Sequence, residues 1–185
     1  MINHNLLPGM VCNSVEFFVV ENMVKAIKGG KVIDFSEIPI GIIELLREEI
    51  YKDEAVIHAL HEMQPDSEWK RLQQYVSCKF GGLDHQGDIT EGLFQDGEYW
   101  DCPMRGKCAH EGVVCKLPIV NGHRLTPQQI TLMQLSATEK TNEVIIDELN
   151  IAPGTFHKLK SILHSILGIQ TKQGITKFCN LLNLI

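Results

Sequence analysis

The last third of the chain, residues 125–185, consists of four short amphipathic stretches separated by brief polar breaks. The first has a clear start signal, because Thr126 and Gln129 have the spacing of a capping box and Pro127 stands where proline suits the first turn of a helix. Helices this short are unstable alone in water, so the four are expected to share one hydrophobic core. The sequence therefore predicts a small helical domain at this end of the chain.

The second and third stretches of this domain are joined by a tight turn. Thr141 is the expected cap of the second helix, and Pro153 opens a third helix over about residues 153–167. Only residues 150–152 separate the two, and a fourth helix is expected from about Thr171. Two helices joined in this way and supported by two others have the organisation of a helix-turn-helix.

This predicted domain resembles the LuxR-type (GerE-like) helix-turn-helix. It carries the opening Leu-Thr-Pro of that family at residues 125–127, a divergent form of the Ile-Ser-Pro-x-Thr-Val turn at residues 151–156, and the closing Leu-Gly at residues 167–168. Gln129 stands where the family usually has Glu, and Ala152 replaces the usual capping serine. The resemblance implies a sequence-specific DNA-binding transcriptional regulator whose third helix enters the major groove of double-stranded DNA.

The resemblance also implies a set of DNA contacts. The positions that face bases correspond to His157, Lys158 and Ser161 on the third helix. Phosphate contacts are implied at the start of the second helix and at two further positions of the third. These phosphate contacts would come from Thr141, Asn142, Thr155 and Lys160.

Charge is distributed unevenly along the chain. Residues 125–185 contain five Lys against four acidic residues, whereas residues 1–124 contain 12 Lys and Arg against 19 Asp and Glu. Phosphate neutralisation supplies most non-specific DNA affinity, so this small positive charge predicts weak binding by one copy and favours two copies on two half-sites. We therefore expect a homodimer. In the resembled family the fourth helix often supplies that contact, here with Ile175, Phe178, Leu182 and Ile185.

Four of the six cysteines form a second informative pattern. Gly106 and Gly112 lie in the loop that carries three of them and allow the backbone to curl, so several sulfur atoms are expected to converge. No signal peptide is expected at the start of the chain, so we expect a cytoplasmic protein, in which clustered thiols favour a metal site over disulfides. The predicted ligands are Cys78, Cys102, Cys108 and Cys115.

Four thiolates suit either Zn²⁺ or an iron–sulfur cluster. The cysteine spacing lacks the paired C-x2-C knuckles of zinc ribbons, and its longer loops favour a [4Fe-4S] cluster slightly over Zn²⁺. The triplet at residues 102–115 also resembles that of bacterial regulators of iron–sulfur cluster assembly. His85 and His110 are reserve ligands, whereas Cys12 and Cys179 are expected to be small buried hydrophobic residues.

The N-terminal region is predicted to be mostly helical. Helical patterns cover residues 14–28 and three segments between residues 42 and 79, a short strand is expected at 31–35, and Asp96-Gly97 indicates a hairpin that leads into the cysteine loop. The expected fold is therefore mainly α. Its parts are a domain at 1–115 that ends in the metal loop, a linker at 116–124, and the helix-turn-helix domain at 125–185.

The sequence argues against two other classes of function and leaves a third open. An enzyme is not expected, because the chain contains no Walker loop, GxGxxG, HExxH or GxSxG pattern. A membrane protein is not expected either, because no stretch approaches the roughly 18 apolar residues that span a bilayer. The remaining alternative is a metal-stabilised adaptor that binds RNA polymerase or another regulator through the C-terminal helices.

Overall fold

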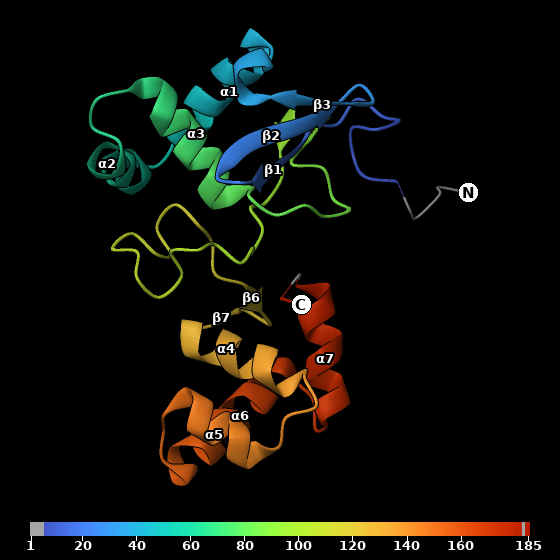
Figure 1. The fold of residues 1–185 in the computed structure, drawn as a ribbon, viewed down its shortest axis with the longest axis vertical. Coiled ribbons are helices and arrows are strands. Elements are labelled where there is room, and N and C mark those ends of the chain that lie inside the picture. Colours follow the sequence, from blue (N-terminus) through green and yellow to red (C-terminus); the bar gives the residue numbers. More distant parts are fainter. Residues whose placement is uncertain (1–5, 183) are drawn as a thin grey trace. The chain divides into compact units, whose positions relative to one another are not determined.

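The computed structural model describes residues 6–182 and 184–185, and it divides the chain into two compact units, Met1–Lys116 and Leu117–Ile185. The described residues form seven α-helices and three small antiparallel sheets (Figure 1). The fold is therefore mixed, and the expectation of a mainly α protein holds only in part. No helix in the described part of the chain has both the length and the apolar composition needed to cross a membrane.

The N-terminal unit begins with a three-stranded antiparallel sheet of order β1-β2-β3. Its strands are β1 (Glu16–Val20), β2 (Met23–Lys28) and β3 (Lys31–Asp34). The helix predicted over residues 14–28 is thus wrong. Glu21 and Asn22 both have positive φ, of 51° and 62°, and form the tight turn that pairs Val20 with Met23. The short strand predicted at 31–35 is present.

Three helices pack beside this sheet: α1 (Ile40–Ile50), α2 (Glu54–Met63) and α3 (Glu68–Lys79). Asp53 caps α2 by accepting hydrogen bonds from two backbone N–H groups, and Ser67 caps α3 in the same way with one. The contacts of α3 extend to α1, α2, β1 and β2. The three helices predicted between residues 42 and 79 are therefore confirmed, and α3 lies at the centre of their core.

A second hairpin connects α3 to the cysteine loop. It is formed by β4 (Ile89–Thr90) and β5 (Leu93–Phe94), with its turn at Glu91-Gly92 and not at the predicted Asp96-Gly97. Glu91 and Gly92 both adopt positive φ, as a tight two-residue turn requires. Gly97 instead lies against Lys79, where an added Cβ would be 2.5 Å from the Cγ atom of that lysine.

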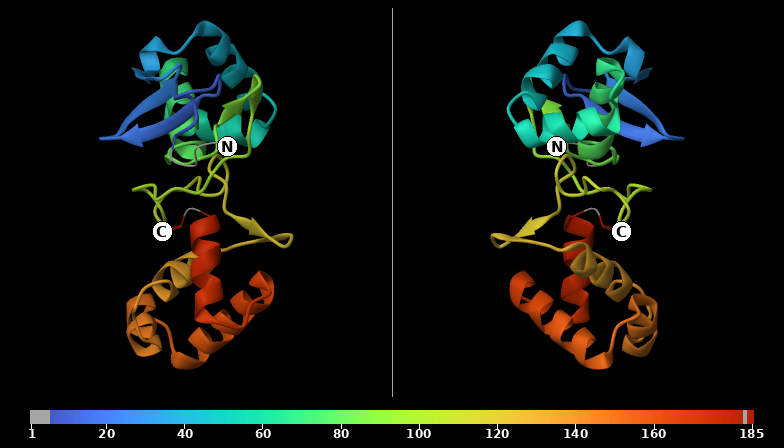
Figure 2. Two further views of the ribbon diagram at one scale, coloured as in Figure 1. Left: turned by 90° about the vertical axis from the view of Figure 1, so that its right-hand side faces the viewer. Right: turned by 90° about the vertical axis from the view of Figure 1, so that its left-hand side faces the viewer.

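The C-terminal unit contains a short hairpin and four helices. The hairpin strands are β6 (Ile119–Val120) and β7 (His123–Arg124), so most of the predicted linker at 116–124 belongs to this unit. Asn121 in the hairpin turn donates a side-chain hydrogen bond of 2.9 Å to the carbonyl oxygen of Ile166. The helices are α4 (Pro127–Ser136), α5 (Asn142–Leu149), α6 (Pro153–Leu167) and α7 (Lys172–Leu181), as seen from two sides in Figure 2.

Local signals in the sequence account for the boundaries of these helices. Thr126 and Gln129 form the predicted capping box of α4, and Thr171 caps α7. Asn150 ends α5 in the left-handed conformation, with φ of 50°, and the chain enters α6 at Pro153. The helices pack through α4, which contacts α5, α6 and α7, and Phe156 is among the fully buried side chains.

The core of the N-terminal unit can be tested with two substitutions on α1. Leu46→Ala should lower the free energy of unfolding by about 3 kcal/mol, because Leu46 is fully buried and its loss leaves a cavity. Ile40→Ala on the same helix should change it by less than about 0.5 kcal/mol, because Ile40 is 70% exposed. Both tryptophans, Trp69 and Trp100, lie in this unit, so their fluorescence during urea denaturation reports its unfolding. Equal effects of the two substitutions would contradict the assigned core.

Candidate metal centre and helix-turn-helix surface

All four predicted metal ligands line one cavity of about 230 Å³ in the N-terminal unit. Cys78 comes from the end of α3, and the other three come from the loop that follows residue 100. The remaining wall mixes apolar, polar and charged side chains. The lining residues are Met63, Gln74, Cys78, Cys102, Met104, Arg105, Cys108, His110, Glu111 and Cys115.

Cys78 is fixed by its helix and by its neighbours. It is buried, and Gln74, one turn earlier on α3, lies with its side-chain nitrogen 3.2 Å from the sulfur atom of Cys78. Burial raises the pKa of Cys78 to about 11, and negative charge on the other three cysteines acts in the same direction. The four thiols can influence one another in this way because they line the same cavity.

Backbone turns position the three loop cysteines. The N–H group of Arg105 donates to the carbonyl oxygen of Cys102 at 2.9 Å, and the N–H group of Cys108 donates to that of Met104 at 3.0 Å. The sulfur atoms also accept backbone hydrogen bonds, at 3.5 Å from Met104 to Cys102 and at 3.3 Å from Gly112 to Cys115. Bonds of this kind stabilise a thiolate and orient it for a metal.

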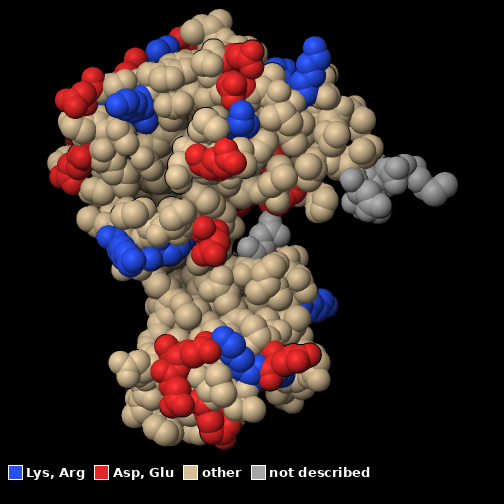
Figure 3. Space-filling view, viewed as in Figure 1, with Lys and Arg blue, Asp and Glu red and all other residues tan. Residues whose placement is uncertain are grey.

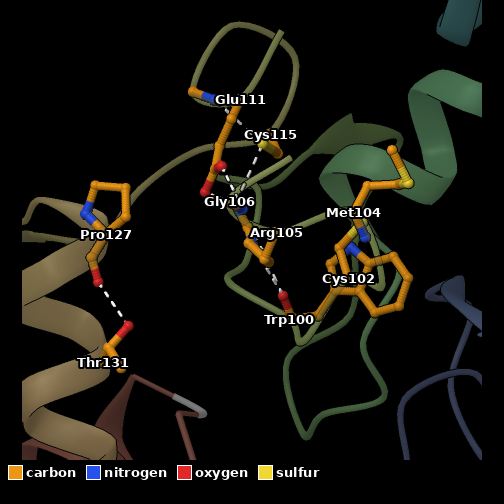
Figure 4. A network of polar contacts seen from close by, with 10 residues as sticks. Trp100, Cys102, Met104, Arg105, Gly106, Glu111, Cys115, Pro127 and Thr131 are labelled. Carbon is orange, nitrogen blue, oxygen red and sulfur yellow. Dashed lines mark hydrogen bonds and ion pairs between the residues drawn. The ribbon is translucent and has the colours of Figure 1, made fainter. Parts of the chain in front are cut away.

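Arg105 supplies positive charge to the centre (Figure 4). Its guanidinium group donates to the sulfur atom of Cys115 at 3.3 Å and to the carbonyl oxygen of Trp100, also at 3.3 Å. A carboxylate oxygen of Glu111 lies 3.6 Å away, and the ring of Tyr99 packs against the group with its centroid 4.3 Å distant. A largely buried arginine held in this way can offset part of the charge of four thiolates.

The spacing of the sulfur atoms bears on which metal the cavity would fit. Among the described residues, no three of these Sγ atoms, with or without His110, lie within 4.8 Å of one another. Four thiolates on one zinc ion would be about 3.8 Å apart, given Zn–S bonds of about 2.3 Å in a tetrahedron. Thiolates on a [4Fe-4S] cluster are farther apart because each binds a different iron atom. A [4Fe-4S] cluster therefore requires a wider separation of its four thiolates than one zinc ion does.

The two histidines predicted as reserve ligands and the two remaining cysteines lie in different environments. His110 lines the cavity, and its Nε2 atom lies 3.1 Å from a carboxylate oxygen of Glu62 on α2. His85 is exposed in the loop after α3 and does not line this cavity. Cys179 is buried as predicted, whereas the prediction of a buried Cys12 is wrong because that residue is exposed beside Ser14.

The predicted DNA-contacting residues lie along α6 and at the start of α5. Thr155, His157, Lys158 and Ser161 are exposed on α6, on the side opposite the buried Phe156 and Leu163. Thr141 and Asn142 are exposed at the start of α5. Thr141 stands at the N-cap position of this helix without capping it through its side chain. Lys160 is half-buried, and its ammonium group lies 3.1 Å from the side-chain oxygen of Asn142.

The charge around this surface is mixed. Acidic side chains gather over α5 on the face shown in Figure 3, and Glu143 lies in the first turn of that helix. The pKa of Glu143 is lowered, with hydrogen bonds from its own backbone N–H and from the side chain of Thr141 as the main causes. These contacts keep a negative charge beside two of the predicted phosphate contacts.

The predicted dimer contacts on α7 differ in exposure. Ile175 is fully buried and belongs to the core of the unit, whereas Phe178 and Leu182 are half-buried and Ile185 is exposed. Leu181, which the sequence analysis did not select, is 73% exposed. The apolar surface available at this end therefore centres on Leu181 and Ile185.

Sequence reasoning missed Gln74 and Arg105 as supporting residues of the cysteine cavity. Gln74 is four residues before Cys78, so helical spacing could have placed it on the same face. Arg105 carries no such signal, because its position depends on the turns of the loop. Comparisons of the chain with protein-family models, curated proteins and solved structures found no match.

The environments of the thiols predict their reactivity in metal-free protein. Cys12 should react with iodoacetamide fastest at pH 8, because it is exposed and its pKa is lowered, chiefly by the hydroxyl group of Ser14. Cys78 should be among the slowest, because burial raises its pKa to about 11 and leaves little thiolate. Peptide mass spectrometry after chelator treatment measures the order, with urea-unfolded protein as the control. Equal rates at the two cysteines in folded protein would contradict these environments.

Proposed function

We propose that this chain is a sequence-specific DNA-binding transcriptional regulator with a metal centre at Cys78, Cys102, Cys108 and Cys115. The observation that carries the proposal is the short connection between α5 and α6, residues 150–152, together with an exposed polar face on α6. This is the organisation of a helix-turn-helix, in which the second helix of the pair enters the major groove.

Three exposed side chains of α6 suit contacts with base edges. His157 and Ser161 can donate or accept hydrogen bonds, and Lys158 can donate to guanine. Phe156 and Leu163 anchor the opposite side of the helix in the core, so the exposed face is held on a rigid element. Thr155, Thr141 and Asn142 would contact phosphates, whereas Lys160 would need to leave Asn142 to do so.

The low positive charge of the C-terminal unit supports binding as a homodimer. With acidic residues over α5, one copy gains little from phosphate neutralisation, and a second half-site would compensate. Leu181 and Ile185 on and after α7 offer exposed apolar area for that contact. RNA polymerase is a further proposed partner.

We assign the metal centre to a [4Fe-4S] cluster in preference to Zn²⁺. The cavity of about 230 Å³ that the four cysteines line supports a group larger than one ion. The hydrogen bonds to Cys78, Cys102 and Cys115 would stabilise the thiolates that hold it. Such a cluster would supply a redox change or a response to oxygen. The hydrogen bond from Arg105 to Cys115 would tune its reduction potential, because hydrogen bonds to the sulfur ligands affect that potential.

The covalent connection suggests how the centre would influence DNA binding. Only Lys116 separates Cys115 from Leu117, the first residue of the C-terminal unit. Loss of metal ligation at Cys115 would therefore release the chain at the point where the two units join. In this proposal, the state of the cluster sets the affinity for DNA.

An adaptor that binds RNA polymerase or another regulator is the second candidate. Val144 on α5 and Ile162 on α6 favour it, because they are 42% and 44% exposed and apolar on the helix pair. An adaptor would tolerate changes at His157 and Lys158 that a DNA reader would not.

The DNA-binding proposal predicts that selection from a random duplex library with the full chain recovers a consensus. His157→Ala should then weaken binding to that consensus by about tenfold, because a lost base contact is worth about 1–3 kcal/mol. Ser165→Ala, at an exposed position nearer the end of α6, is the matched control and should bind like the wild type. Failure to select any consensus would reject DNA reading, and capture of RNA polymerase by the same protein would favour the adaptor.

The metal proposal predicts a brown protein after purification without oxygen, with about four iron and four sulfide per chain. Cys108→Ser should lose most of this iron, because one of four ligands to the cluster is removed. Cys12→Ser should keep it, because Cys12 is exposed and does not line the cavity. A colourless wild type with about one zinc per chain would reject the cluster and retain a structural metal site. Loss of iron in Cys12→Ser would reject the assigned ligands.

A further inference from the structure

A second group of potential ligands lies apart from the cysteines, in the same N-terminal unit. Glu16 on β1, Asp84 in the loop after α3 and Glu98 after the β4–β5 hairpin have carboxylate oxygens within 4.8 Å of one another. These residues are distant in sequence, so folding of the unit is needed to bring them together. None of them lines the cysteine cavity.

Glu16 places a fully buried carboxylate in this group. Its relative exposure is 0%, and its Oε1 atom accepts a hydrogen bond of 2.9 Å from the backbone N–H of Asp84. Its Oε2 atom is buried and accepts no hydrogen bond of ordinary geometry among the described residues, although the nearby backbone N–H of Asp88 slightly lowers the pKa of the group. A buried carboxylate oxygen without a partner is costly, so a proton or a cation is needed to stabilise it.

No basic side chain among the described residues neutralises the negative charge of Glu16 or Glu98. Within residues 6–182 and 184–185, no Lys, Arg or His forms an ion pair with Glu16 or Glu98, and their charge interactions come from other carboxylates. Buried Asp88, which accepts from the backbone N–H of Phe17 at 2.7 Å, adds a further carboxyl group. The buried ammonium group of Lys79 pairs with Glu49 at 3.3 Å and not with this group.

The pKa values of three carboxyl groups in this region are raised, because burial and mutual repulsion both disfavour their charged forms. Burial raises the pKa of Glu16 and of Glu98 to about 8, and that of Asp88 to about 10. Repulsion from neighbouring carboxylates acts in the same direction for all three. A divalent cation would relieve both effects at neutral pH, because it favours the charged form of each ligand.

The backbone at Gly82 lies close to the carboxylate of Glu98. Gly82 donates its N–H to Oε1 of Glu98, and a Cβ atom at this position would lie 2.7 Å from that oxygen. The loop from Gly81 is also tied to the sheet, because the N–H of Val19 donates to the carbonyl oxygen of Gly81 at 3.0 Å. Glu98 is therefore held in place before any ligand binds.

We propose that Glu16, Asp84 and Glu98 form a binding site for a hard divalent cation of the Ca²⁺ or Mg²⁺ class. All the donors are oxygen atoms, which such ions prefer, whereas the four thiols suit softer metals. The cation would tie β1, the loop after α3 and the segment that enters the cysteine loop. This inference does not depend on the proposed function.

The test uses the full chain at pH 7.5, titrated separately with Ca²⁺, Mg²⁺ and Mn²⁺ by calorimetry after removal of bound metal with EDTA and dialysis. At least one ion should bind saturably with one site per chain. A hundredfold excess of that ion over its Kd should raise the melting temperature of the N-terminal unit by at least about 5 °C.

Two variants and a control decide the assignment. Glu16→Gln and Glu98→Gln should each weaken binding of the cation by at least tenfold and remove the rise in melting temperature. Glu91→Gln, an exposed carboxylate in the nearby hairpin turn, should behave like the wild type. No saturable binding of any of the three ions, or full binding in Glu16→Gln, would overturn the proposal and leave protons as the neutralising groups. Hard ions bind thiolates poorly, so neither result decides the cysteine centre.

Discussion

Burial of Phe80 at the end of α3 is the interaction on which the N-terminal unit depends most. Its ring is fully buried, stacks on Phe94 at 5.6 Å between centroids, and lies 6.3 Å from the rings of Phe17 and Tyr75. It thereby joins the sheet, the last turn of α3 and the second hairpin. Cys78 lies two residues before it, so the position of the cysteine cavity follows from the packing of this ring.

The sequence predicted elements whose signals are local. The helices of the C-terminal unit were found because Thr126, Pro153 and Thr171 mark their starts and helical spacing marks their buried faces. The first two strands were missed because their apolar residues also fit a helical period. Their turn at Glu21-Asn22 has no glycine to reveal it. The spacing of apolar residues alone does not distinguish a helix from two strands here. The contacts of α3 with β1 and the tight turn at Glu21-Asn22 favour the two strands.

At the candidate site too, residues with a local sequence signal could be predicted, whereas residues whose role depends on distant segments could not. The four cysteines could be selected because thiols in a short loop are rare and chemically distinctive, and the structure places them around one cavity. Arg105 and the carboxylate of Glu16 could not be selected. Their surroundings are made by segments distant in sequence, and a glutamate in a strand has no pattern that separates a buried ligand from a solvated side chain.

The short hairpin before α4 belongs to the same compact unit as the four C-terminal helices. Leu125 donates its N–H to the carbonyl oxygen of Pro118 at 2.8 Å, and Asn121 holds the carbonyl oxygen of Ile166. A fragment that begins at Leu125 would lose both bonds and expose Leu125, which is fully buried in the intact unit. The natural boundary for transplanting this module is therefore Leu117, eight residues earlier than sequence similarity alone would place it.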